Sequence, residues 1–216
     1  MRTGRPRKFN LDEALDRAMD VFWRQGYEGA SLADLTAAMG INSPSLYAAF
    51  ENKEGLFRAV LDRYDSVRKG FMDEVLSAPS ARDVAEAFLK GVVDYTADPK
   101  NLPGCLLLQS GLSCSDNVIP NELARHRAQK ELALRERFEC ARRSGDLPKD
   151  ADAGALARYL VTVSNGMAVQ ATSGATAADL REIARIALMA WPVGNTTIPR
   201  KARRRRKTSE RAALAH

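Results

Sequence analysis

The sequence predicts an all-α protein of about nine helices joined by short loops. Apolar residues recur at helical spacing along most of its 216 residues, and most of these segments begin at an Asn, Ser, Thr or Asp that can cap a helix. No segment alternates apolar and polar residues as a half-buried strand does. Hydrophobic residues make up 45% of the chain, yet no apolar run is long enough to cross a bilayer. We therefore expect a folded cytoplasmic protein that does not enter a membrane.

Capping residues and helix breakers place the helices in order. Asn10, with Glu13 three residues later, begins the first helix, which is expected to end in the stretch 26–29. Beyond residue 50 the expected N-terminal caps are Asn52, Ser80, Asp150 or Asp152, and Thr176. Prolines and glycines mark the expected breaks, at Pro103-Gly104, at Pro120 (the start of a long charged helix), at Gly145 and at Pro192.

Residues 31–50 carry the strongest functional pattern. Ser31 begins a short helix, Gly40 permits a tight turn with positive φ, and Ser43 is expected to cap a second short helix, with Pro44 at its first position. Two short helices across such a turn form a helix-turn-helix when apolar residues join them, here Leu35, Met39, Ile41 and Leu46. The second helix would then present to a DNA major groove Asn42, Ser43, Ser45, Tyr47 and Ala48. The alternative is an ordinary pair of helices in a bundle.

The pattern continues beyond this motif. Gly26-Tyr27, Ser31, Gly40, Leu46-Tyr47, Phe50 and Lys53-Glu54 together resemble the TetR family of bacterial repressors over residues 10–60. The resemblance implies a homodimer that binds palindromic double-stranded operator DNA and releases it when a small-molecule effector binds the C-terminal domain. It also places at DNA-contacting positions Ser31, Ser43, Ser45, Tyr47 and Lys53.

The chemistry of these positions agrees with DNA contact. Ser31 and Ser43 are expected at helix N-termini, where backbone N–H groups favour phosphate, and Lys53 begins the next helix as a point charge. The Tyr47 hydroxyl suits a phosphate and its ring suits a sugar edge, while Ala48 suits a thymine methyl group. Arg, Asn and Gln are side chains that commonly read base edges, and in the predicted recognition helix Asn42 is the only residue of these types.

Charge is distributed unevenly along the chain. The net charge is +6, but residues 1–8 carry +4 and residues 200–216 carry +7, so residues 9–199 carry −5. Basic ends on an acidic body suggest arms that gain affinity from phosphates without reading sequence. Arg5 and Arg7 are expected to reach phosphates or a minor groove. The division we expect is a DNA-binding domain at 1–51, an effector-binding and dimerisation domain at 52–199, and a disordered basic tail at 200–216.

Two sets of residues are expected to serve the second domain. A cavity for an apolar or aromatic effector would be lined by Tyr64, Phe71, Phe88, Tyr95, Gln109, Phe138, Asn165 and Met167. The alternative for these residues is a role in the plain hydrophobic core. Residues 167–192 resemble the dimerising last two helices of one TetR subgroup. Close approach of two subunits there would use Ala157, Val161, Ser164, Ala184, Ala187 and Leu188.

The remaining functional alternatives rest on few residues. Cys105, Cys114 and Cys140 lack CxxC spacing and are expected to be free thiols, with a thiol- or metal-responsive repressor using Cys105 as the alternative to effector binding. His126 is the only other candidate metal ligand of note, so no metal or cofactor is expected. An enzyme is not expected, because no nucleotide-binding, hydrolase or metalloprotease motif occurs. A nucleoid-type protein that uses only its basic ends remains a further alternative.

Overall fold

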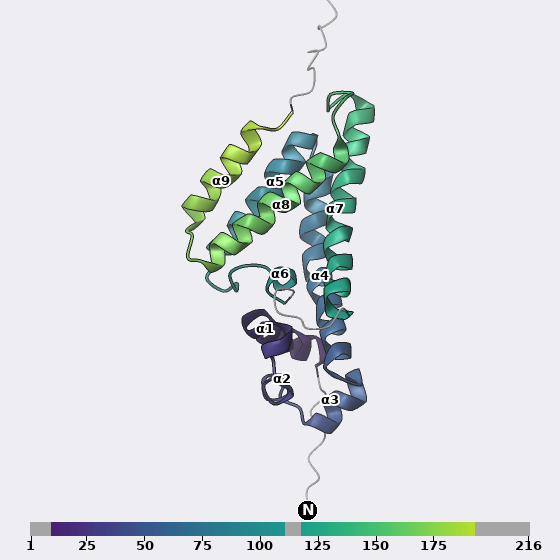
Figure 1. The fold of residues 1–216 in the computed structure, drawn as a ribbon, viewed down its shortest axis with the longest axis vertical. Helices are drawn as coiled ribbons and strands as arrows, with labels where there is room; N and C mark the ends of the chain where they lie inside the picture. The colour runs from purple at the N-terminus through teal and green to yellow at the C-terminus, as the bar shows by residue number, and fades with distance from the viewer. Residues whose placement is uncertain (1–9, 111–117, 193–216) are drawn as a thin grey trace, which may run out of the picture.

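The computed structural model describes residues 10–110 and 118–192, and within these ranges it is helical without strands, which confirms the all-α class (Figure 1). Its nine helices in the described ranges are α1 (Leu11–Gly29), α2 (Leu32–Met39), α3 (Ser43–Phe50), α4 (Lys53–Ser77), α5 (Ala81–Ala97), α6 (Leu106–Gln109), α7 (Val118–Ser144), α8 (Ala153–Thr172) and α9 (Ala177–Met189). None of these described helices combines the length and apolarity that a membrane span requires.

Side-chain caps begin most helices where the sequence predicted them. Ser80 and Thr176 each form a capping box, in which the acid three residues later accepts a hydrogen bond from the backbone N–H of the cap. The other predicted caps that accept a backbone N–H are Asn10, Ser31, Asn52 and Asp152. Local sequence alone therefore determines where these helices begin.

The cap of α3 is Asn42, and the prediction of Ser43 was wrong. The Asn42 side-chain oxygen accepts from the Ser45 N–H at 2.9 Å, whereas Ser43 is already the first helical residue. Asn and Ser are equally good caps, so local preference did not separate them. Pro44 still lies in the first turn, where its missing N–H needs no intrahelical acceptor.

Two other boundaries lie earlier than expected, and prolines explain both. Helix α5 ends at Ala97 and not at Pro103, because Pro99 holds Asp98 in the extended region (ψ 115°). Helix α7 begins at Val118, two residues before Pro120, because a proline is tolerated within the first helical turn.

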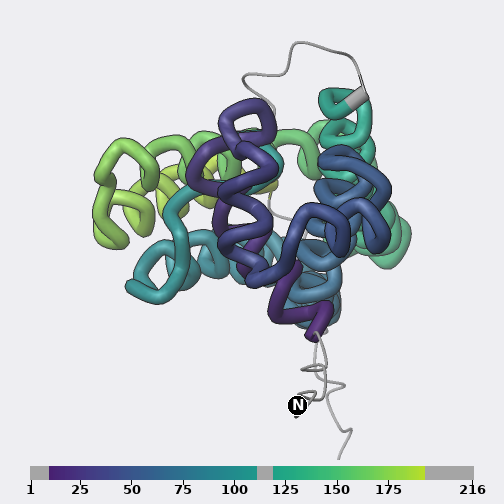
Figure 2. Tube along the Cα trace, turned by 90° about the horizontal axis from the view of Figure 1, so that it is seen from below, coloured from purple at the N-terminus to yellow at the C-terminus, as the bar shows by residue number. Residues whose placement is uncertain are grey.

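The buried side chains form two cores. The head core joins α1–α3, the first half of α4, α6 and the start of α7. The body core joins the end of α4 with α5, α7, α8 and α9. Helix α4 runs through both, as Figure 1 shows. Figure 2 views the molecule from the end that carries α1–α3, with α8 and α9 extending to one side behind them.

The small residues expected between subunits are buried inside one chain instead. Ala157, Val161, Ser164, Ala184 and Ala187 are at most 9% exposed in the body core, and Leu188 is partly buried against it. Their short side chains let α8 and α9 pack closely on α5. These residues therefore pack within the chain, and their part in a subunit interface stays a prediction. Leu132 of α7, by contrast, is 53% exposed.

We predict opposite effects for two glycine substitutions. Gly40 ends α2 with φ 70° and ψ 32°, where a Cβ is strained, so Gly40→Ala should lower the free energy of unfolding by roughly 1–2 kcal/mol. Gly70 lies inside α4, and apart from its chain neighbours and the adjacent helix backbone no atom lies within 4 Å of the position that a Cβ would take. Gly70→Ala should therefore raise the free energy of unfolding by up to about 1 kcal/mol. Urea denaturation at one protein concentration measures both, and a Gly40→Ala protein as stable as the parent would contradict the strain argument.

Candidate functional site

The turn between α2 and α3 fixes how α3 is presented. The Gly40 N–H donates to the Ala37 carbonyl at 3.2 Å, and the Ile41 N–H donates to the Thr36 carbonyl at 3.1 Å, which satisfies the end of α2. Leu35, Met39 and Leu46 are buried beneath the turn, and Ile41 packs against the same core at its edge. The apolar residues predicted to join the two helices therefore do so.

The outer face of α3 is exposed. Leu46 and Phe50 point into the head core, which leaves Asn42, Ser43, Ser45, Tyr47 and Ala48 exposed on the other side. The Tyr47 side chain, 48% exposed, is the largest of these. Gly55 lets α3 end close against α4, because a Cβ there would lie 2.0 Å from the Phe50 carbonyl oxygen. The helix is thus anchored from behind while its polar and small side chains face outward.

Ser31 and Lys53 lie beside this face but are already engaged. The Ser31 hydroxyl accepts from the Asp34 N–H at 3.0 Å and donates to the Asp34 carboxylate at 2.7 Å. The Lys53 ammonium donates to the Glu28 carbonyl at 3.3 Å and lies 4.7 Å from the centre of the Tyr27 ring. Lys53 therefore connects the start of α4 to the end of α1. Arg5 and Arg7 lie outside the described residues.

Helix α4 is fastened to α1 by both apolar and charged contacts. The Phe22 and Phe57 rings meet edge to face at 4.8 Å. The Arg63 guanidinium donates two hydrogen bonds to Asp16, at 2.8 and 2.9 Å, and a third to Asp12 at 3.2 Å. These bonds, above all those to Asp16, raise the pKa of Arg63. These contacts join α4 directly to the helix that supports α2 and α3.

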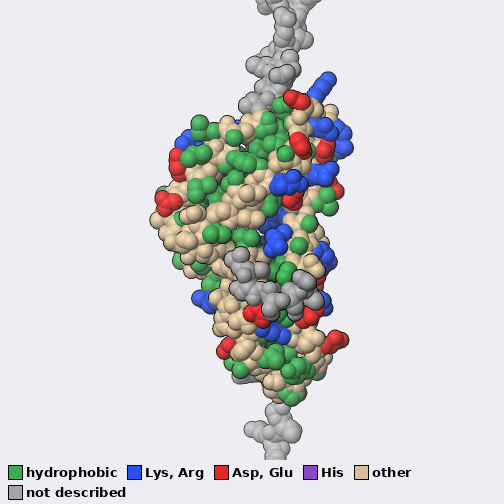
Figure 3. Space-filling view, viewed as in Figure 1, with side chains coloured by type: hydrophobic (Ala, Val, Ile, Leu, Met, Phe, Trp, Pro, Cys, Tyr) green, Lys and Arg blue, Asp and Glu red, His purple; other side chains and the backbone are tan. Residues whose placement is uncertain are grey.

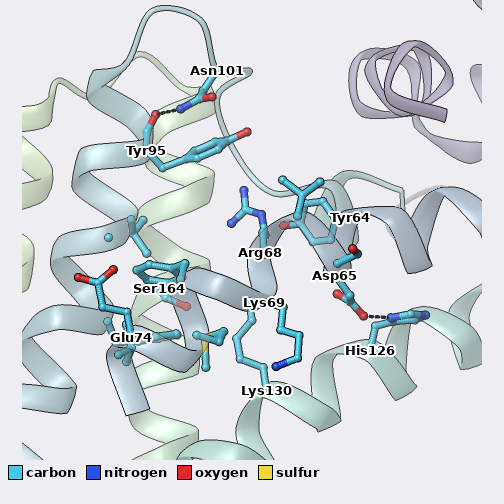
Figure 4. Close-up of a pocket in the computed structure, with 18 of the residues that line it drawn as sticks. Tyr64, Asp65, Arg68, Lys69, Glu74, Tyr95, Asn101, His126, Lys130 and Ser164 are labelled. Carbon is cyan, nitrogen blue, oxygen red and sulfur yellow. Dashed lines mark hydrogen bonds and ion pairs between the residues drawn. The ribbon is translucent and has the colours of Figure 1, made fainter. Parts of the chain in front are cut away.

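A cavity of about 1060 Å³ lies among α1, α4, α5 and α7. Arg68 projects into it with its guanidinium carbon 4.5 Å from the centre of the Tyr64 ring and 4.4 Å from that of Tyr95 (Figure 4). Trp23 of α1 completes this aromatic cage at 5.8 Å, and its indole N–H donates to the Pro103 carbonyl at 3.0 Å. Trp23 of α1 thus forms part of the cavity wall.

Half of the residues predicted for an effector cavity line this space. Tyr64, Phe71, Phe88 and Tyr95 line it, and Asn165 lines a smaller chamber of about 40 Å³ that shares residues with it. Three other predicted residues line neither space. Phe138 meets Trp191 edge to face at 5.2 Å in the body core, Met167 is buried in that core, and the Gln109 amide reaches the Pro103 carbonyl at 3.5 Å.

Sequence reasoning missed the ionisable residues of the cavity. Besides Arg68, these include Lys130 and the pair formed by His126 Nδ1 and the Asp65 carboxylate at 2.5 Å. Arg68 follows Tyr64 by one helical turn, so a cation four residues after an aromatic residue was the available signal. Lys130 and His126 come from a distant helix, and only the tertiary structure brings them here.

The cysteines occupy different surroundings. The Cys105 Sγ lies 3.6 Å from the Tyr64 hydroxyl and lines the small chamber. Burial is the main cause that raises the pKa of Tyr64 well above its usual value. Cys140 is exposed on α7, and Cys114 lies outside the described residues. Across residues 10–110 and 118–192, no three His, Cys, Asp or Glu side chains are grouped as a metal site requires.

Comparison with known proteins points to one family. The model for bacterial regulatory proteins of the tetR family matches residues 14–60. The HTH-type transcriptional repressor ComR of Escherichia coli K12 is 39% identical over 194 residues, which cover 88% of this chain and 92% of ComR. YezE of Bacillus subtilis, an HTH-type transcriptional regulator, is 33% identical over 165 residues, which cover 73% of this chain and 83% of YezE.

A solved structure extends the similarity to the whole fold. A cysteine mutant of CifR, a TetR family transcriptional regulator complexed with 26-bp double-strand operator DNA, superimposes with a TM-score of 0.83 at 41% identity. The alignment covers 87% of this chain and 100% of the CifR chain.

Proposed function

The chain belongs to the TetR family of bacterial regulatory proteins, and from this premise we propose that it is a homodimeric repressor. Each subunit would place α3 in the major groove of one half of a palindromic operator, and a small molecule in the cavity would release the DNA. The observation that carries the proposal is the exposed face of α3, held outward by the Gly40 turn. The CifR complex with operator DNA, at 41% identity, supports this use of the face.

The proposed contacts divide by chemistry. Asn42 and Ala48 are placed to meet base edges, whereas Ser43, Ser45 and Tyr47 are placed to meet phosphates and sugars. Contact by Ser31 or Lys53 requires a phosphate to share or displace their present hydrogen-bond partners. The basic arm at 1–8 would add attraction without sequence preference. We retain 1–51 as the DNA-binding domain, although the head core continues into α4.

The proposed dimer surface is the outer face of α8 and α9 and not their buried small residues. Exposed, uncharged residues recur along α8 at alternating spacings of four and three residues: Ala155, Tyr159, Thr162, Gly166, Val169 and Ser173. On α9, Ile186 is 54% exposed and Met189 is 72% exposed. Figure 3 shows few charged side chains over the middle of this face. An uncharged stripe of this kind on two neighbouring helices is typical of a subunit interface.

The cavity is placed to control the DNA-binding face. Ligand entering it would contact Arg68 on α4 and Trp23 on α1, and α4 is fastened to α1 through Arg63. A shift of α4 would therefore change the separation of the two α3 helices in a dimer. Coupling free energies of this type are typically about 1–3 kcal/mol.

One observation favours a thiol-responsive form of the same repressor as a second candidate. Cys105 opens onto the small chamber, which Arg68 and Lys130 also line. A group attached covalently to Cys105 would occupy the chamber and would release operator in place of a reversibly bound effector.

The proposed function predicts that DNA selected from random fragments by the purified protein contains an inverted repeat. Tyr47→Ala should weaken binding to that sequence about tenfold or more, because Tyr47 is the largest side chain on the exposed face of α3. Leu132→Ala, an exposed residue on α7, is the matched control and should bind as the parent does. Fluorescence anisotropy measures both. Equal affinity for the selected sequence and for random DNA would favour a nucleoid-type protein instead.

Val169→Arg should convert the dimer into monomers, because it places a charge within the uncharged stripe. Sedimentation velocity measures the assembly, and operator affinity should fall by at least about a hundredfold because one subunit reads only half of the operator. Leu132→Arg adds the same charge at an exposed site on α7 and should remain dimeric. A Val169→Arg protein that stays dimeric would show that another surface joins the subunits.

The thiol-responsive candidate predicts that alkylation by iodoacetamide releases operator from the parent protein and not from Cys105→Ser. Cys140→Ser is the control, because Cys140 is exposed on α7 away from the chamber, and it should behave like the parent. Operator retention by fully alkylated parent protein, with modification of Cys105 confirmed by mass spectrometry, would leave the reversible effector as the remaining mechanism.

A further inference from the structure

Arg68 is a cation without a carboxylate partner in the described structure. Its guanidinium stacks among Tyr64, Tyr95 and Trp23, and no described Asp or Glu lies within salt-bridge distance of it. Arg63, five residues earlier on the same helix, differs from Arg68 because its guanidinium is paired with the Asp16 carboxylate. The aromatic faces stabilise the positive charge of Arg68 but leave N–H groups available to an acceptor.

Lys130 brings a second cation to the same place. Its ammonium makes no ion pair with any described residue, and burial is the main cause that lowers the pKa of Lys130. Cys105 and Asp65 oppose that shift, whereas the charge of Arg68 adds to it. Two cations that repel each other in a desolvated space are stabilised together when an anion lies between them.

The two cations share a chamber of the size of an anionic group. The chamber of about 40 Å³ is lined by Arg68 and Lys130 together with polar side chains of Thr96, Ser164 and Asn165. A volume of this order holds roughly one water molecule or a carboxylate group. The large cavity beside it shares Arg68, Lys130, Tyr95 and Ser164, and has apolar walls that include Phe71, Met72, Phe88 and Leu102.

The acidic residues that line the large cavity do not cancel these cations. Asp65, the acid among them that is partly buried, is paired with His126. The other acids that line the cavity have exposed side chains at its edge: Asp20, Asp62, Asp73, Glu74 and Asp94. Of these, Asp73 is also paired with Lys69, and Asp94 with Lys90. Neither cation forms an ion pair with these acids, whose side chains are exposed at the edge of the cavity or, for Asp65, hydrogen-bonded to His126.

We propose that the effector is a small organic carboxylate with an apolar body. Its carboxylate would enter the small chamber between Arg68 and Lys130, and its hydrocarbon part would lie against the apolar walls of the large cavity. This inference rests on the proposed role of the cavity in effector binding and adds the chemical class of the ligand. Because Trp23 belongs to the cage around Arg68, binding of the carboxylate would also change the surroundings of Trp23.

Three ligands with one hydrocarbon body test the proposal: 3-phenylpropionate, 3-phenylpropan-1-ol and 3-phenylpropylamine. The chain has two tryptophans, so in Trp191→Phe the fluorescence reports on Trp23 alone. We expect the carboxylate to bind at least about tenfold more tightly than the alcohol, and the amine to bind most weakly, by calorimetry and by Trp23 fluorescence. Equal affinity for carboxylate and alcohol, or binding by neither, would overturn the proposal.

Charge-removing variants locate the site. Arg68→Met and Lys130→Met should each weaken 3-phenylpropionate binding about tenfold or more while changing the affinity for the alcohol less than about threefold. Lys149→Met removes the same charge from an exposed residue that lines neither the cavity nor the chamber, so it should bind as the parent does. Arg68→Lys keeps the charge and should retain most of the preference for carboxylate over alcohol. Circular dichroism confirms folding of each variant, and the ligand series on the parent chain decides the proposal if one does not fold.

Operator release separates this inference from the proposed function. If 3-phenylpropionate binds with the predicted preference but operator stays bound, the proposed anion site is supported and its role as the effector site is contradicted. If neutral compounds release operator while 3-phenylpropionate neither binds nor releases it, the proposed repressor function is supported and the proposal of a carboxylate effector is contradicted. If Arg68→Met neither binds 3-phenylpropionate nor releases operator in its presence, while the parent does both, the carboxylate site and its role as the effector site are both supported.

Discussion

The packing of α4 against α1 is the constraint on which the rest of the structure depends. The Phe22–Phe57 contact and the hydrogen bonds from Arg63 to Asp16 hold the two helices together at the end that carries α2 and α3. Farther along α4, Arg68 stacks against Trp23 of α1 within the wall of the cavity. One helix pair thus supports the DNA-facing helices and also contacts whatever occupies the cavity. In the proposed mechanism, this helix pair would couple the two sites without a separate linking element.

Much of this arrangement was predictable because it is local in sequence. Caps such as Ser80 and Thr176 satisfy orphan N–H groups a few residues away, and Gly40 supplies a backbone conformation that other residues adopt only under strain. Where two residues served equally well, as Asn42 and Ser43 did, the sequence could not decide between them. The exposed face of α3 was also predictable, since burial of Leu46 and Phe50 determines which side of a short helix faces outward.

The cavity was only partly predictable, because its contacts join residues far apart in the chain. Trp23, Arg68 and Lys130 come from different helices, and no spacing rule connects them. The small residues of α8 and α9 illustrate the same limit. Small side chains indicate close helix packing, but the sequence does not say whether the neighbouring helix belongs to the same chain. Here the neighbour of Ala157 and Ala184 is within the chain, and the outward stripe lies on the opposite side of α8.

The continuity of α4 from Lys53 to Ser77 has a consequence for how such a chain can diverge. Each residue added to or removed from an α-helix rotates everything beyond it by about 100°. A single-codon insertion between Arg63 and Arg68 would turn Arg68 out of its aromatic cage while Phe57 stayed in place beside Phe22. An insertion or deletion within α4 would therefore disrupt the cage, whereas a substitution in the cavity wall leaves the rest of the helix in register.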